Sequence, residues 1–567
     1  MPTILDDLTP ADLSLPAKFT EFREIQKQLV DYCLYGPDGD GEVRRFMACG
    51  AGPGSGKSLA AHALAQMSGM KTVILTATKA LEDQQIDDNF DCVNIHGRAN
   101  YQCLDFEPLH PDVRWSCEDG PDHDCQRYDT PYCAYAGRVG KAREARVVLT
   151  NYAYWLHARS NNRQALERRA DERDGGQPEP IELLIADEAH LILGQLASFL
   201  STWVGNHDLH RFADKAVRAA LVESKGAESG RLGTSWVVAL SEVRNGAWKR
   251  MYEIAREYES EARASRGSKE YRALERLAGN LDRVLSHATV EEEELSSGRQ
   301  VGQPNWLWRL TRNGVALDVI WPARYAERYL WSGVSRVVLM SASLRPKALG
   351  LTGIKQSDSW FREWPRVFPG ELSPVYWIPT GKMGHRESEE EKGKSITRLD
   401  EIGDEWREYK GIVHTNSYTR AKWYQANSKW GRAMVLSKPG EQAAAAEKYR
   451  KAVAPCMLVS PSFTTGFDFP DEDCGYQVIV KLPYPDRSDP VVLARAESDP
   501  DWYDYTTMNT LFQACGRKSR RADQRCVTMI TDDSVKNFRH YSKQHAPRYF
   551  TVRESVTVPK APGLMSE

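Results

Sequence analysis

The chain has 567 residues, of which 41% are hydrophobic and 27% are charged, and its formal net charge is -3. This composition is typical of folded globular domains and excludes a largely disordered chain, a collagen-like repeat and a small disulfide scaffold. The near-neutral charge excludes a uniformly basic nucleic-acid coat, although it is compatible with a local basic groove. The acidic first residues and the absence of an apolar run of roughly 20 residues lead us to expect a cytoplasmic protein with no membrane partner.

Short β-branched runs bounded by polar or glycine-rich residues predict buried strands in two groups. The first group is Phe46–Cys49, Thr72–Ala77, Arg146–Thr150, Glu182–Ala186 and Arg336–Ser341. The second group is Gly411–Thr415, Met434–Ser437, Cys456–Ser460, Gln477–Lys481 and Arg525–Thr531. Helical patterns lie between many of these runs, and alternation of strand and helix is typical of a mostly parallel sheet. The sequence therefore predicts an α/β fold with two parallel-sheet domains.

A candidate phosphate loop follows the first strand, because residues 51–58 read AGPGSGKS and precede a predicted helix at Leu59–Met67. This strand–loop–helix context is that of a Walker A loop, although Ala51 stands where glycine is usual. Small residues let backbone N–H groups turn toward the phosphates of a nucleotide. Lys57 is expected to reach the β- and γ-phosphates, and Ser58 is expected to bind Mg²⁺. The predicted nucleotide-binding residues of the loop are Gly52, Gly54, Ser55, Gly56, Lys57 and Ser58.

Four cysteines, Cys103, Cys117, Cys125 and Cys133, lie within about forty residues that contain few aliphatic side chains. Four thiolates suit a tetrahedral metal ion or a cluster, and a segment without its own core needs such a group to hold it. Structural zinc usually shows pairs of cysteines two to four residues apart, and this segment has none, so a zinc ribbon is disfavoured. The alternative is a loop-rich insertion with four unpaired thiols.

A second acidic motif, Asp187-Glu188-Ala189-His190, follows the predicted strand Glu182–Ala186. The carboxyl end of a strand in a parallel sheet is where ligands and catalytic groups gather. Asp187 is expected to hold Mg²⁺ through water, and Glu188 to orient or deprotonate the attacking water. Further along the chain, residues from about 196 to 305 read as helical, with Leu274, Leu281 and Leu285 on one face that is suited to helix packing.

The phosphate loop and the DEAH motif together resemble those of superfamily 2 helicases. The resemblance extends to TATKALEDQ at 76–84, SASL at 341–344, TTGFD at 464–468 and QACGRKSR at 513–520. It implies that Gln513, Arg517 and Arg520 act on the γ-phosphate of ATP from the second domain, where an incoming arginine is worth roughly 10³–10⁵ in rate. A solvated basic helix end is the alternative for that segment. The resemblance also implies that Gln26 reads adenine and that Gly466 and Asp468 contribute to the nucleotide site.

The four-cysteine segment resembles the iron–sulfur domain of DinG/XPD-type DNA helicases, which carries a [4Fe–4S] cluster, and zinc is the less favoured occupant of the same ligands. The resemblance implies a first RecA-like domain formed by residues 1–100, 141–195 and 306–345. It implies an iron–sulfur domain at 101–140, a helical arch at 196–305 and a second RecA-like domain at 346–567.

Polar residues that follow the predicted strands are candidates for holding one DNA strand, because hydroxyl and amide groups bind phosphates without reading sequence. These residues are Thr78, Asn151, Tyr152, Thr415 and Ser417. We therefore expect a monomeric ATP-dependent DNA helicase that acts on single-stranded DNA and duplex junctions, with 5′→3′ movement implied by the resemblance. The alternatives are a translocase or RNA-directed motor without unwinding, and a binding module that ATP switches without catalysis.

Overall fold

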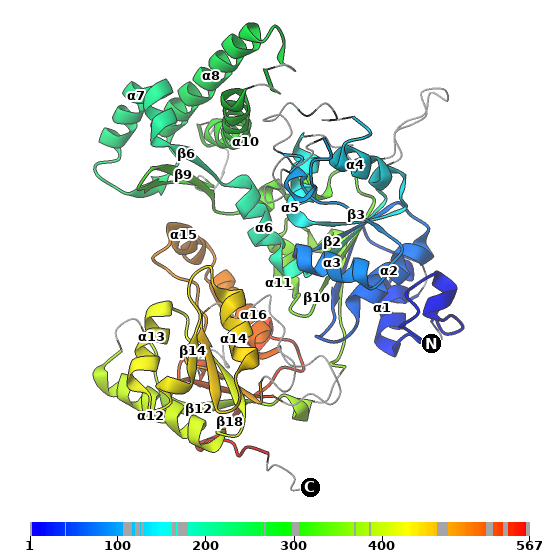
Figure 1. Cartoon of the computed structure of the whole chain (residues 1–567), viewed down its shortest axis with the longest axis vertical. Coiled ribbons are helices and arrows are strands. Elements are labelled where there is room, and N and C mark those ends of the chain that lie inside the picture. The colour runs from blue at the N-terminus through cyan, green and yellow to red at the C-terminus, as the bar shows by residue number, and fades with distance from the viewer. Residues whose placement is uncertain are drawn as a thin grey trace.

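The computed structural model describes residues 3–39, 41–105, 116–118, 125, 127, 130–161, 166–167, 180–261, 264–265, 268–296, 305–367, 370–384, 387–461, 474–516, 526–536 and 543–562. These residues form two seven-stranded parallel sheets and one four-stranded antiparallel sheet. Figure 1 shows the two parallel sheets in the middle and at one end of the long axis, with three long helices at the other end.

The first parallel sheet has the strand order β11-β1-β10-β5-β2-β4-β3. Its strands are β1 (Phe46–Gly50), β2 (Thr72–Thr76), β3 (Val93–Asn94), β4 (Val147–Asn151), β5 (Leu183–Asp187), β10 (Arg336–Ser341) and β11 (Ser359–Glu363). Every residue of β1, β2 and β5 is buried, because helices cover both faces of the sheet. One face packs on α1 (Glu24–Tyr35) and α2 (Lys57–Ser68), and the other packs on α5 (Tyr152–Asn161) and α6 (Ile192–Leu200). The prediction of a parallel α/β sheet is confirmed for this part.

The end of the first sheet corrects one predicted boundary. The strand β11 runs parallel to β1, with Phe46 beside Ser359 and Gly50 beside Glu363. A second domain that begins at residue 346 would exclude this strand, so the first sheet extends to Glu363. The segment has no β-branched residue, so Trp360, Phe361 and the pairing with β1 make it a strand.

The second parallel sheet has the strand order β14-β15-β13-β16-β17-β12-β18. Its strands are β12 (Val375–Gly381), β13 (Lys410–His414), β14 (Met434–Leu436), β15 (Cys456–Ser460), β16 (Tyr476–Ile479), β17 (Val527–Asp532) and β18 (Val552–Glu554). One face packs on α12 (Glu389–Glu405) and α13 (Tyr418–Asn427). The other face packs on α14 (Gln442–Lys451) and α16 (Pro500–Cys515). The five strands predicted for this half are all present.

Three long helices stand on the antiparallel sheet, and the helices and this sheet are both inserted between β5 and β10 of the first parallel sheet. The helices are α7 (Asn206–Glu223), α8 (Thr234–Glu257) and α10 (Lys269–Ser296). The sheet, in the order β6-β9-β8-β7, contains β6 (Thr202–Gly205), β7 (Ser229–Arg231), β8 (Trp306–Thr311) and β9 (Gly314–Val319). The resemblance implies that residues 306–345 belong to the first parallel-sheet domain. Because β8 and β9 pair with β6 and β7, residues 306–319 belong instead to the antiparallel sheet. None of the described helices combines the length and the hydrophobicity that crossing a bilayer requires.

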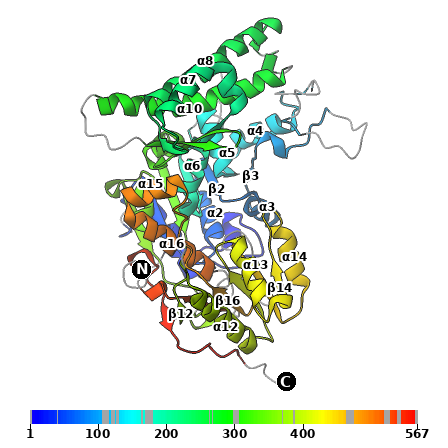
Figure 2. The ribbon, with the colours of Figure 1, turned by 90° about the vertical axis from the view of Figure 1, so that its left-hand side faces the viewer.

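The second domain contacts the antiparallel sheet through α15 (Pro490–Ser498), which lies between them in both views (Figures 1 and 2). The half-buried guanidinium of Arg495 donates to the carbonyl of Val319 at 3.3 Å and to that of Ile320 at 2.5 Å. Trp321 Nε1 donates to Ser498 Oγ at 3.1 Å, and the ring of Trp321 meets Trp502 edge-on. This contact joins the second domain to the base of the long helices.

Replacing Arg495 by alanine is expected to loosen this contact, because two buried carbonyls lose their donor at a cost of about 1–3 kcal/mol each. Hydrogen–deuterium exchange should rise at residues 305–321 in Arg495→Ala. The exposed Arg407 supplies the matched control, since Arg407→Ala should leave that exchange unchanged. Equal exchange in both variants would contradict the role of Arg495.

Candidate nucleotide site and nucleic-acid surface

The predicted phosphate loop connects β1 to α2, whose first residue is Lys57. Gly54 and Gly56 both have φ of 74°, a conformation that favours glycine. The side chain of Ser55 is buried, and its hydroxyl has no hydrogen-bond partner among the described residues. A buried hydroxyl without a partner costs free energy unless a ligand or water satisfies it, so the loop fits an incoming phosphate.

Gln26 joins α1 to this loop. Its Oε1 accepts from the backbone N–H of Arg23 at 2.9 Å, and its Nε2 donates to the carbonyl of Gly56 at 3.2 Å. Each amide atom keeps one further hydrogen-bonding position, which is the capacity that reading a base edge requires. A cavity of about 400 Å³ lies beside it, lined by residues that include Gln26, Gly56 and Ser58.

Replacing Gly56 by alanine is expected to lower nucleotide affinity at least tenfold, because the new Cβ would lie 2.0 Å from Gln26 Nε2 at a positive φ. Titration of each variant with a fluorescent ATP analogue measures the nucleotide affinity. Gly69 is the matched control, since it also has a positive φ of 66° but nothing lies within 4 Å of its added Cβ. Gly69→Ala should cost some stability and leave nucleotide affinity unchanged.

The two acidic residues of the DEAH motif stand at the carboxyl end of β5, where Asp187 is the last residue of the strand and Glu188 follows it. The phosphate loop follows the carboxyl end of β1 in the same sheet. Burial, and then the charge of Glu188, raise the pKa of Asp187 to about 6. Burial also opposes ionisation of Glu188, but the charge of Lys57 and the bond to His190 outweigh it and lower its pKa to about 2. Glu188 also has a left-handed backbone with φ of 50°, a conformation that is uncommon for residues other than glycine. Glu188 is therefore a carboxylate held beside a lysine.

A chain of polar side chains leads from Glu188 into the second domain. Ser341 Oγ donates to Glu188 Oε2 at 3.3 Å and lies 2.7 Å from His190 Nδ1. The hydroxyls of Ser341 and Ser343 are 3.4 Å apart. Gln513 Nε2, on α16, then donates to Ser343 Oγ at 2.8 Å. The acidic motif, the SASL segment and the QACGRKSR segment are thus connected across the two sheets.

The end of α16 meets the phosphate loop directly. A Cβ added at Gly516 would lie 3.4 Å from Pro53 Cγ. At the other end of the helix, Lys347 Nζ lies 2.7 Å from Asp499 and 3.1 Å from Asp501. The predicted site residues Arg517, Arg520, Gly466 and Asp468 lie outside the described residues.

The predicted nucleic-acid contacts occupy the carboxyl ends of strands in both sheets. Thr78 caps α3 (Lys79–Asp87), where its Oγ1 accepts from Leu81 N, and Ser417 caps α13 in the same way. Helix N-termini of this kind bind phosphate oxygens. Asn151 ends β4, the strand beside β2, and its Nδ2 donates to Glu82. Thr415 directly follows β13, and its Oγ1 donates to the carbonyl of Ser417.

Tyr152, the fifth predicted nucleic-acid contact, is buried in the core. Its ring is fully buried, and its hydroxyl donates to the carbonyl of Asp187 at 2.7 Å. Burial raises the pKa of this hydroxyl well above its ordinary value, so it remains a donor. From this position the ring supports the acidic motif and offers no face to a base.

The four cysteines come together in two pairs. The sulfur atoms of Cys103 and Cys125 are 3.4 Å apart, and those of Cys117 and Cys133 are 3.9 Å apart. None of the four forms a disulfide, and all except Cys125 are buried. In the part of the chain that the structure describes, no group of three or more His, Cys, Asp or Glu side chains is arranged to hold one metal ion. The chemistry of the four side chains still suits a thiolate-bound group, because each pair brings two free thiols together in a segment with few aliphatic side chains.

Several residues of the site were not among the predicted ones. His190 and Ser343 extend the predicted motifs, and their position within DEAH and SASL was an available signal. Arg23, whose Nη1 donates to the carbonyl of Gly54, lies three residues before Gln26. Tyr549 reaches the phosphate loop from the end of the chain and carries no motif that could have indicated it.

Comparison with known proteins agrees with this architecture. Residues 395–548 match the family model of the helicase C-terminal domain. A solved XPD helicase is similar with a TM-score of 0.57 and 14% identity, covering 94% of this chain and 100% of that chain. The Xpd4 protein of S. tokodaii is similar with a TM-score of 0.55 and 14% identity over the same shares of each chain. No curated protein sequence matches this chain. The expected resemblance is confirmed at the level of the fold.

Proposed function

We propose that this chain, which has the fold of the XPD-like superfamily 2 helicases, is an ATP-dependent DNA helicase. The polar chain from Glu188 through Ser341 and Ser343 to Gln513 carries the proposal. It links the residues suited to ATP hydrolysis with a second domain that bears its own candidate phosphate-binding helix end. A nucleotide that changes the first site can therefore change the position of the second domain.

In this proposal the phosphate loop binds ATP between the two domains, and Gln26 reads the base. Lys57 neutralises the β- and γ-phosphates, while Ser58 and Asp187 would hold Mg²⁺, which supplies charge compensation when bound. Glu188, ionised at neutral pH, takes a proton from the attacking water. Gln513 reports the state of the acidic motif to α16, and Arg517 and Arg520, which follow Gly516 in the sequence, stabilise charge on the γ-phosphate. Gly466 and Asp468 complete the nucleotide site.

A single strand would lie along the capped helix ends of both sheets. Thr78 and Ser417 supply hydroxyls beside helix N-termini, and Asn151 and Thr415 continue the same edge of each sheet. These groups suit phosphates rather than bases, so binding would be independent of sequence. Closing and opening of the two domains around ATP would then advance the strand.

The preference for DNA rests on the four-cysteine segment and its resemblance to DinG/XPD-type enzymes. Cys103, Cys117, Cys125 and Cys133 would hold a [4Fe–4S] cluster, which would hold together a segment poor in aliphatic side chains. The domain division carries over with two changes: the first domain extends to Glu363, and residues 306–319 belong to the antiparallel sheet. Residues 101–140 form the iron–sulfur domain, and the helices α7, α8 and α10 form the arch.

Strand displacement on 5′-tailed and 3′-tailed duplexes, together with ATP hydrolysis stimulated by DNA or by RNA, tests this function. We expect ATP-dependent displacement of DNA from the 5′-tailed substrate. Hydrolysis without displacement would indicate a translocase, RNA-specific stimulation would indicate an RNA-directed motor, and nucleotide binding without turnover would indicate a switched binding module. Each of these three outcomes contradicts the proposed helicase.

A further inference from the structure

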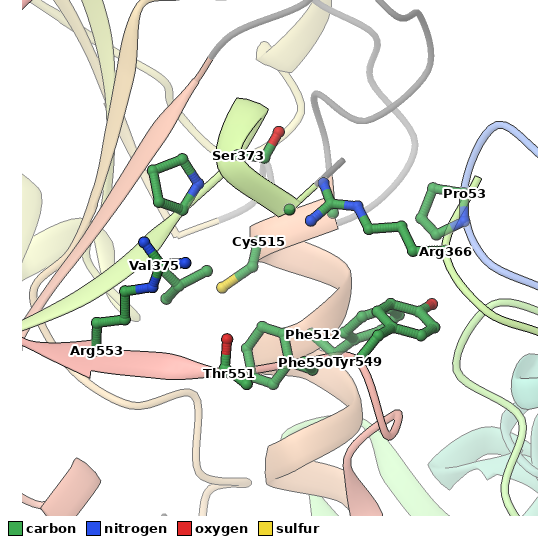
Figure 3. Close-up of a pocket in the computed structure, with 13 residues that line it drawn as sticks. Pro53, Arg366, Ser373, Val375, Phe512, Cys515, Tyr549, Phe550, Thr551 and Arg553 are labelled. Carbon is green, nitrogen blue, oxygen red and sulfur yellow. The ribbon is translucent and has the colours of Figure 1, made fainter. Parts of the chain in front are cut away.

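A small pocket separates the phosphate loop from the C-terminal part of the second domain (Figure 3). Its volume is about 60 Å³, and its lining includes Pro53, Arg366, Phe512, Cys515 and Tyr549. This space admits a few water molecules but no nucleotide. A contact with ATP would therefore have to be made from the wall of the pocket, on the side that faces the loop.

Tyr549 forms that wall. A Cβ added at Gly52 would lie 2.9 Å from its hydroxyl oxygen, so the hydroxyl rests against the backbone of the loop. In Figure 3 the hydroxyl points toward the loop that carries Pro53. The ring is held from behind by Phe512, with ring centroids 6.1 Å apart, and β18 fixes the following residues beside β12.

The hydroxyl of Tyr549 is buried and has no hydrogen-bond partner among the described residues. Burial raises its pKa to about 12, so it keeps its proton at neutral pH and can donate a hydrogen bond. Although the hydroxyl lies against the phosphate loop, it donates to none of the backbone carbonyls of that loop. A buried donor left in this state costs about 1–3 kcal/mol, which is typical of a group that a ligand satisfies.

We infer that Tyr549 is a nucleotide-sensing residue whose hydroxyl donates to the terminal phosphate of ATP. The inference rests on the proposed function, because it takes the loop of residues 51–58 as the phosphate site. The hydroxyl lies on the face of the loop turned toward Gly516, and the terminal phosphate is the part of ATP that faces the second domain. ATP and ADP differ at this contact, so the C-terminal segment distinguishes the two nucleotides.

Replacing Tyr549 by phenylalanine tests this inference, because it removes the hydroxyl and keeps the ring. The affinity for a non-hydrolysable ATP analogue should fall about tenfold or more, as expected for a hydrogen bond to a charged group. The affinity for ADP should change less than twofold. Thermal stability should stay the same or rise, because the variant no longer buries an unsatisfied hydroxyl.

Tyr505 provides the matched control. It lies on α16, its hydroxyl is also buried and without a partner among the described residues, and it does not line the pocket. Tyr505→Phe should leave affinity for both nucleotides unchanged. The inference is overturned if Tyr549→Phe binds the ATP analogue like the wild type, if it loses ATP and ADP equally, or if it loses stability together with affinity. A wild type that binds no nucleotide would instead overturn the proposed function, so the two failures are distinguishable.

Discussion

The variant Glu188→Gln is expected to lose ATP hydrolysis by a factor of about 10²–10⁴, the range that a positioned general base contributes. Glutamine has the same shape as glutamate and can keep the hydrogen bond from Ser341, but it cannot take a proton from water. The low pKa of Glu188, about 2, means that the wild-type side chain is ionised throughout the physiological range. Steady-state phosphate release stimulated by single-stranded DNA measures the loss.

Affinity for ATP should distinguish Glu188→Gln from Lys57→Ala. Glu188→Gln should retain affinity for an ATP analogue, because the loop residues are untouched. Lys57→Ala should lose both hydrolysis and affinity, because it removes the cation that faces the phosphates. Wild-type turnover in Glu188→Gln would show that another group activates the water, and the assignment of the DEAH motif would then be abandoned.

The two parallel sheets could be predicted because their strands carry a local signal. Runs such as Thr72–Thr76 and residues 456–459 are continuously apolar or β-branched, and both faces of each sheet are covered. The edge strand β11 is not continuously apolar or β-branched, and its signal is limited to Trp360 and Phe361, so its place in the sheet follows from pairing with β1. The hairpin of β8 and β9 turns at Arg312 and Asn313, and its partner strands β6 and β7 are short segments at the ends of helices, so the antiparallel sheet forms from pairing across the chain.

Within the candidate site, sequence reasoning found residues whose role follows from a contiguous motif. The phosphate loop and the DEAH residues are of this kind, because a loop or strand end places each side chain relative to its neighbours. Tyr152 was predicted to contact nucleic acid from its place after a strand, yet its hydroxyl supports Asp187 from within the core. Tyr549 depends on contacts between segments almost 500 residues apart, and only the folded chain brings it to Gly52.

Replacing Cys103 by serine is expected to abolish the metal content of the protein. Cys103 touches Cys125 at 3.4 Å, and serine is a far weaker ligand for iron than a thiolate. The purified wild type should be brown and contain iron and acid-labile sulfide in equal amounts, whereas Cys103→Ser should be colourless. Strand displacement should also fall in Cys103→Ser. Without the cluster, the four-cysteine segment has few aliphatic side chains to keep it folded.

Cys92 supplies the control for this experiment, because it is a free cysteine close in sequence that is not one of the four. Cys92→Ser should keep the colour, the iron and the sulfide of the wild type. A colourless wild type that contains zinc would contradict the iron–sulfur cluster while keeping the four cysteines as ligands. A wild type that contains neither metal would leave the four cysteines as ordinary free thiols, and the preference for DNA drawn from that segment would lose its support.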